Sequence, residues 1–233
     1  MRKVSTRYIN AGAGANQRFS APPIIQTVSE LVFNAFVTLL VVLDPLGMAP
    51  IFVGLTRDRT DAYRREAAIR GTALGTAILF VFALVGQELL DALGIGFSAF
   101  RIAGGALLFL LSLDMVFARP LGMRRAVREG EEAQEEEDDI SVFPLAIPLI
   151  AGPGALTTIL LYTDNGDLLE VTAVMGVLLV VLLLVLFSLL LAPRVMSVFG
   201  QTGANVLSRV LGVLLAALAV QFVLDGITQS FAL

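Results

Sequence analysis

Hydrophobic residues occur in six long runs that polar residues seldom interrupt. The runs cover residues 28–55, 67–90, 97–118, 140–162, 168–192 and 204–227. A helix rises about 1.5 Å per residue, so about 20 apolar residues cross a hydrocarbon core of about 30 Å. An open chain satisfies its own backbone hydrogen bonds in lipid only as a helix. The pattern therefore predicts an all-α membrane protein with six transmembrane helices.

The composition agrees with this class and narrows the chemistry. Of the 233 residues, 57% are hydrophobic and 15% are charged, whereas soluble domains carry about 25% charged residues. The chain has no Cys and no His, which removes thiolate ligands, Cys nucleophiles and imidazole bases. The carboxylates within the runs do not cluster. We therefore expect no enzyme activity, no metal site and no cofactor.

Two hydrophilic segments flank or divide the runs. Residues 1–27 contain four basic residues and no apolar stretch typical of a cleaved signal peptide, so we expect a flexible N-terminal extension. Residues 119–139 begin basic and end in a run of acids. Like charges repel and cannot form a core, so we expect a solvated linker, with docking of a partner as the alternative.

The distribution of basic residues predicts the orientation in the membrane. If the loops alternate sides, one side collects eleven Lys and Arg residues and the other side five. The side richer in Lys and Arg faces the cytoplasm. We therefore expect a multi-pass protein of the cell inner membrane, with residues 119–139 in the cytoplasm and both termini outside.

The chain also contains an internal repeat. Pro45 and Pro153 are 108 residues apart, and so are Arg101 and Arg209. The sequence RIAGGAL that starts at Arg101 is echoed by RVLGVLL, which starts at Arg209. Two separate pairs of matching residues with the same separation of 108 residues indicate a duplication.

The repeat predicts two halves of opposite orientation. Residues 28–118 and residues 140–233 each hold three runs. Since three is odd, the second half enters the membrane from the other side. Inverted repeats with broken helices at matching positions are typical of secondary transporters, whose substrates bind near the midplane.

The first run of each half is broken, at Asp44-Pro45 and at Gly152-Pro153. Proline cannot continue a helix, but it is favoured at the first helical position after an Asp or Gly N-cap. Each break therefore predicts the start of a half-helix inside the membrane. The alternative is a pair of proline kinks whose backbone groups are satisfied by neighbouring helices.

Half-helix starts present positive dipole ends and free carbonyls. We expect the N–H groups of two residue pairs to point toward the membrane centre and to suit an anionic group. These pairs are Gly47 with Met48, and Ala155 with Leu156. The carbonyls that the prolines free belong to Val41 and Leu149 and could hold a cation, and Thr157 and Thr158 add hydroxyls beyond the second break.

Ionisable residues inside membrane spans are candidate functional residues. Asp44 is the deepest, and it can act as a helix cap, as an ion or proton site, or as both. Asp114 and Asp225 lie near span ends, where we expect them to meet water. Gln221 lies one turn before Asp225 and can share its face.

Small residues recur four positions apart, at Gly71 and Gly75 and again at Ala99 and Ala103, and the adjacent Gly104 and Gly105 add a smooth face. Small residues let membrane helices approach closely, so we expect these positions to serve packing.

Three motifs give the chain a family resemblance. The sequences DPLGMAPIF (44–52), PLAIPLIAGP (144–153) and LDGI (224–227) resemble the MarC family of bacterial inner-membrane proteins over roughly residues 28–230. The resemblance implies a kinship with small exporters of the LysE type and with neutral amino acid transporters coupled to an ion gradient. The motif positions carried over are Asp44, Pro45, Gly47, Pro50, Gly152, Pro153 and Gly154.

One position departs from the family pattern. Relatives often carry Asn after the glycine of the first motif, where this chain has Met48. If that Asn contacts substrate, the substrate of this chain differs.

The sequence thus favours a secondary transporter or exporter of a small solute, such as a neutral amino acid, driven by H⁺ or Na⁺. The alternatives are a structural or regulatory membrane protein and a passive channel. The expected partners are the lipid bilayer, the solute and a second copy of the chain, but no nucleic acid.

Overall fold

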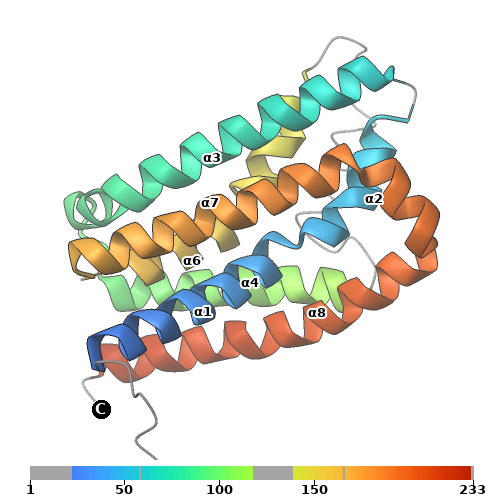
Figure 1. Cartoon of the computed structure of the whole chain (residues 1–233). Coiled ribbons are helices and arrows are strands. Elements are labelled where there is room, and N and C mark those ends of the chain that lie inside the picture. Colours follow the sequence, from blue (N-terminus) through green and yellow to red (C-terminus); the bar gives the residue numbers. More distant parts are fainter. Residues whose placement is uncertain (1–22, 58, 118–138, 165, 232–233) are drawn as a thin grey trace, which may run out of the picture.

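The computed structural model describes residues 23–57, 59–117, 139–164 and 166–231, which form helices and connecting turns and no strand (Figure 1). The elements, in chain order, are α1 (Pro23–Leu43), α2 (Pro45–Leu55), α3 (Asp61–Ala92), α4 (Phe97–Phe117), η1 (Ser141–Ile150), α6 (Pro153–Thr163), α7 (Leu168–Leu190) and α8 (Ala192–Ser230). The prediction of an all-α protein is confirmed.

Several helices are long enough to cross a membrane. Within the described residues, five helices are long and apolar enough to cross a membrane. The number is six when the bent pair of η1 and α6 counts as one span. The first of these spans joins α1 and α2 across the break, and η1 meets α6 at an angle of 51°. The prediction of a multi-pass membrane protein is confirmed.

Successive spans alternate in direction along the bundle (Figure 1). The start of α1 and the end of α8 lie at one end. The α2–α3 turn, the end of α4, the start of η1 and the α7–α8 turn lie at the other end, which we call the linker end. The extension and the linker expected from sequence lie mostly outside the described residues. α1 begins at Pro23, inside the expected extension of residues 1–27.

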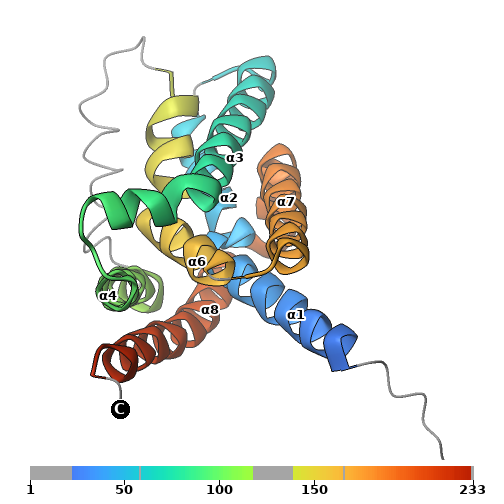
Figure 2. The same ribbon diagram turned by 90° about the vertical axis from the view of Figure 1, so that its left-hand side faces the viewer.

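Helix α6 lies at the centre of the bundle, in contact with α1, α3, α4 and α7, as the end-on view also shows (Figure 2). Glycines allow the helices around it to approach closely. A β-carbon on Gly104 of α4 would overlap Thr157 of α6, and one on Gly105 would lie 2.8 Å from the carbonyl oxygen of Ala219 in α8. Gly71 of α3 likewise packs against Leu145 of η1. The prediction that the small residues serve packing is confirmed.

The first part of the fourth run is not the regular helix that hydropathy predicts. In η1 the N–H of Leu145 donates to the carbonyl of Ile140 at 3.3 Å, five residues back instead of four. Phe143 and Ile147 have extended backbones, and each precedes a cis proline. A proline lacks the N–H and disfavours helical geometry in the residue before it. Two prolines four residues apart therefore exclude a straight α-helix here.

Helix α8 begins earlier than its hydrophobic run. It bends at Gly200, whose φ of 62° favours glycine. The span itself covers Asn205–Ser230. The part before Gly200 turns across the linker end of the bundle (Figure 1).

Candidate functional site

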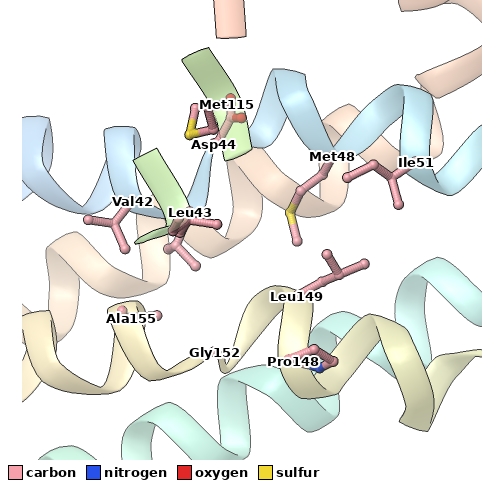
Figure 3. Close-up of a pocket in the computed structure, with 12 residues that line it drawn as sticks. Val42, Leu43, Asp44, Met48, Ile51, Met115, Pro148, Leu149, Gly152 and Ala155 are labelled. Carbon is pink, nitrogen blue, oxygen red and sulfur yellow. The ribbon is translucent and has the colours of Figure 1, made fainter. Parts of the chain in front are cut away.

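The two breaks face each other across a cavity of about 50 Å³ inside the bundle (Figure 3). The walls come from the first break, from the second break and from α4. Its lining consists of Val42, Leu43, Asp44, Met48, Ile51, Leu111, Met115, Pro148, Leu149, Gly152, Gly154 and Ala155. The fold therefore brings together the two positions that the repeat marks in the sequence.

The first break is capped by its own carboxylate. Asp44 has a left-handed backbone, with φ of 41°, and Pro45 is the first residue of α2. The Oδ1 atom of Asp44 accepts a hydrogen bond from the N–H of Gly47 at 2.9 Å. Asp44 is 4% exposed. The prediction that Asp44 is a buried helix cap is confirmed.

At the second break, helix α6 starts without a side-chain cap. Gly152 is the N-cap of α6 and Pro153 is its first residue, as expected. Gly152 has no side chain, so no side-chain acceptor caps α6. Gly154 and Ala155, in the first turn of α6, line the cavity.

Most of the amides expected to be open are already bonded. The N–H of Gly47 donates to the Asp44 carboxylate, and the N–H of Met48 donates to the Asp44 carbonyl at 3.1 Å. The N–H of Leu156 donates to the Gly152 carbonyl at 3.0 Å. The expectation was wrong for these three groups, because each lies within reach of its own cap residue. The positive end that faces the cavity belongs to α6.

Two hydrogen bonds tie the broken spans to other helices, and the sequence pattern predicts neither. The Ser188 hydroxyl of α7 donates to the carbonyl of Pro45 at 2.6 Å. The Thr38 hydroxyl of α1 lies 2.9 Å from the hydroxyl of Tyr162 in α6. The partners are more than 120 residues apart in the chain, so no local pattern could have linked them.

The two threonines after the second break lie off the cavity. The Thr157 hydroxyl donates to the carbonyl of Pro153 at 2.8 Å, within its own helix. Thr158 is fully buried, and its hydroxyl has no hydrogen-bond partner among the described residues. Pro50 lies inside α2, also off the cavity.

The secondary candidates do not line the cavity either. Asp114 is 3% exposed, so the expectation that it meets water at a span end was wrong. It lies in the last turns of α4, which pack closely against α8 at Gly212. Asp225 accepts a hydrogen bond from the side-chain amide of Gln221 at 2.7 Å. The prediction that these two share a face of α8 is confirmed.

The cavity is thus polar at two points and apolar elsewhere. The Asp44 carboxylate lies on one wall, and the uncapped start of α6, a positive dipole end, forms part of another. Met48 and Leu149 point toward each other from opposite walls (Figure 3). The carboxylate suits a positive group, and the start of α6 suits a negative one. No group of three or more acidic residues suited to a metal occurs within the described residues.

Comparison with known proteins identifies the family. A profile of the MarC family integral membrane proteins matches residues 29–231. A UPF0056 membrane protein of Archaeoglobus fulgidus is 39% identical over 200 residues, covering 84% of this chain and 92% of the relative. A UPF0056 membrane protein of Methanocaldococcus jannaschii is 37% identical, covering 83% and 94%.

A third relative is the UPF0056 membrane protein YhcE of Escherichia coli, 30% identical over 89% of this chain and 98% of the relative. No solved structure matches the chain. The match over nearly all of the membrane-spanning region, together with three similar relatives, means that this chain belongs to the MarC family of integral membrane proteins.

Proposed function

We propose that the protein is a secondary transporter or exporter of a small solute, with its binding site at the cavity between the two proline breaks. The observation that carries the proposal is the convergence of Asp44 and the uncapped start of α6 on one cavity between the two breaks. Secondary transporters bind their substrates at such discontinuous helices.

The chemistry of the walls fits a neutral amino acid. The ammonium group of a zwitterion would lie against the Asp44 carboxylate. Its carboxylate would lie at the N–H groups of Gly154 and Ala155, where a helix start favours an anion. An apolar side chain would lie against Met48 and Leu149. Asp44 is also the proposed site for a coupling H⁺ or Na⁺.

The cavity must widen to hold such a solute. Its volume is about 50 Å³, whereas small-molecule sites have roughly 300–1,000 Å³. We therefore propose that the cavity is narrow in this conformation and that it widens and opens alternately to the two sides.

The packing of the helices supports the two inverted repeats, residues 28–118 and 140–233. α1 packs on α7 as η1 packs on α3, and α2 packs on α8 as α6 packs on α4. These two pairs of contacts exchange with each other when α1 to α4 are exchanged with η1 to α8. Corresponding spans also run in opposite directions (Figure 1).

We propose an orientation with the linker end in the cytoplasm, in the cell inner membrane. Basic residues of the described chain gather at that end, including Arg57, Arg65 and Arg194, and Arg101 lies toward the other end. The positive-inside rule supports this orientation. Both termini then face outward.

Solute uptake into proteoliposomes tests the function. Neutral amino acids are screened with and without a Na⁺ or H⁺ gradient, against protein-free liposomes. Saturable uptake that requires a gradient supports a secondary transporter. Uptake that neither saturates nor depends on a gradient indicates a passive channel.

In a structural or regulatory role, the charged run of the linker would be the segment that docks a partner. Deleting residues 129–139 should leave the uptake rate of a transporter unchanged. Absence of uptake for all tested solutes, together with a phenotype that the deletion abolishes, would favour the regulatory role. An intramembrane enzyme has no support in the scattered carboxylates of the spans, and we propose that the protein is not one.

A further inference from the structure

A second pocket, of about 570 Å³, lies at the linker end between α2, α3, α7 and the start of α8. It shares no lining residue with the central cavity. Three arginines and one acid line it, and most of its other walls are apolar. Nothing in the proposed transport cycle uses this pocket.

One of the three arginines, Arg64, is bonded to other residues of the protein. The Nη1 atom of Arg64 lies 3.0 Å from the Oδ1 atom of Asp61, so the one acid among the described lining residues is paired. The Nε–H of Arg64 donates to the carbonyl of Thr56 at 3.1 Å. These bonds join the end of α2 to the start of α3. The charges of Arg64 and Asp61 compensate each other.

The other two arginines are available. Arg65, in the first turns of α3, and Arg194, in the first turn of α8, are exposed. Neither guanidinium group has an ion pair or a hydrogen bond with any residue that the structure describes. Among the described residues, the pocket therefore carries two positive charges without an ion-pair partner, from two different elements.

The pocket lies where the membrane-spanning runs of α3 and α7 begin and end. Arg65 closely precedes the apolar run of α3, and α7 ends at Leu190. The apolar part of the lining includes Val53 and Leu189. A pocket that combines charged and apolar walls suits a phospholipid, which joins a charged headgroup to acyl chains.

The bend in α8 creates this juxtaposition. Because the helix turns at Gly200, the segment that holds Arg194 lies across the linker end instead of along the bundle (Figure 1). A straight helix would place Arg194 beyond the start of α3. Arg65 and Arg194 instead line one pocket.

We propose that this pocket binds the headgroup of an anionic phospholipid, with Arg65 and Arg194 contacting its phosphodiester. Basic pockets between membrane helices bind such headgroups, and guanidinium groups form charge-assisted hydrogen bonds to phosphate. The acyl chains lie along the apolar wall formed by α2 and α7. The lipid holds α8 against α3, and this role is independent of solute transport.

Native mass spectrometry of the full chain with added phosphatidylglycerol tests the proposal. The variant R65Q/R194Q removes both charges, and R57Q/R209Q is the matched control, since it removes two exposed arginines of the linker end that lie outside the pocket. We expect the first variant to lose affinity for phosphatidylglycerol by about tenfold or more, the scale for two interfacial arginines. The control should stay within about twofold of the wild type.

Further variants and lipids separate specific binding at the pocket from a folding defect and from general charge attraction. R65K/R194K should retain most of the affinity, which shows that a folding defect is not the cause of a loss. Phosphatidylcholine with the same chains should bind more weakly than phosphatidylglycerol. Equal loss in the pocket variant and the control would overturn the proposal. Displacement of the lipid by millimolar inorganic phosphate would also overturn it and indicate a site for a soluble anion.

Discussion

The carboxylate of Asp44 occupies the space that a β-carbon on residue 47 would need, while its Oδ1 atom accepts a hydrogen bond from the N–H of Gly47 at 2.9 Å. The cap and the glycine therefore depend on each other. Any side chain at residue 47 displaces the carboxylate from the start of α2.

The first prediction concerns this pair. Gly47→Ala should lower the stability by about 1 kcal/mol or more, because the cap is lost and the buried carboxylate is displaced. The control is Gly54→Ala in the same helix, where a β-carbon meets nothing within 4 Å. Removing a helical glycine there should be neutral or stabilising. Heating in detergent followed by size-exclusion chromatography measures both, and equal behaviour would contradict the assigned geometry.

The second prediction separates the charge of Asp44 from its role as a cap. Asn caps a helix about as well as Asp, so Asp44→Asn should keep the thermal stability and lose ion-coupled uptake. Asp44→Ala should lose both. Asp225→Asn, away from the cavity, should transport normally. If Asp44→Asn transports at the wild-type rate with the same pH and Na⁺ dependence, Asp44 is only a cap.

The third prediction tests the contact between α4 and α6. A β-carbon on Gly104 would overlap Thr157, so Gly104→Ala should push the two helices apart and cost about 1–3 kcal/mol. Gly176→Ala is the control, since its surroundings are open. The apparent melting temperature of the purified protein should fall for the first variant only. Equal melting temperatures would show that α4 and α6 are not in close contact.

The fourth prediction concerns orientation. The chain has no Cys, so single cysteines report their own side of the membrane. A cysteine placed in the 119–139 segment should resist a membrane-impermeant reagent in intact cells. One placed near residue 95, between α3 and α4, should be labelled. The opposite pattern would reverse the orientation.

The fifth prediction concerns pH. The Ser141 hydroxyl and the Ser141 backbone N–H, which donates to Asp139 at 3.0 Å, hold the pKa of Asp139 below its ordinary value. A lowered pKa contributes stability that is complete above the ordinary pKa of about 4 and is lost as the pH falls through the lower pKa of the folded state. The stability difference between wild type and Asp139→Ala should therefore be constant from pH 8 to about pH 5 and shrink below about pH 4. A difference as large at pH 3 as at pH 5 would contradict this.

The fold was predictable where local patterns decide it. Hydropathy located the spans, and the Asp-Pro and Gly-Pro pairs located the two helix starts, because capping depends on neighbouring residues. The irregular path of η1 was not predicted, although Pro144 and Pro148 signal it. A hydropathy pattern treats proline as an apolar residue and does not show that it lacks the backbone N–H that a regular helix needs.

The candidate site was predictable only in part. The repeat pointed to the two breaks, but the depth of Asp114 and the bonds of Ser188 and Tyr162 depend on how helices pack. The central cavity also differs from expectation in its electrostatics. An N–H that is expected to bind a ligand can be satisfied by its own cap, and only the atomic positions at Gly47 and Leu156 reveal that.

The hydrogen bond from Ser188 to Pro45 has a mechanical consequence. It fastens α7, from the second half of the chain, to the break in the first half. On the other side of the cavity, α3 from the first half packs on η1 and α6. Elements of the two halves are therefore joined on both sides of the cavity. In the proposed transport cycle, the parts that separate would each contain elements of both halves, and cutting the chain between the halves would still leave its two fragments interlocked.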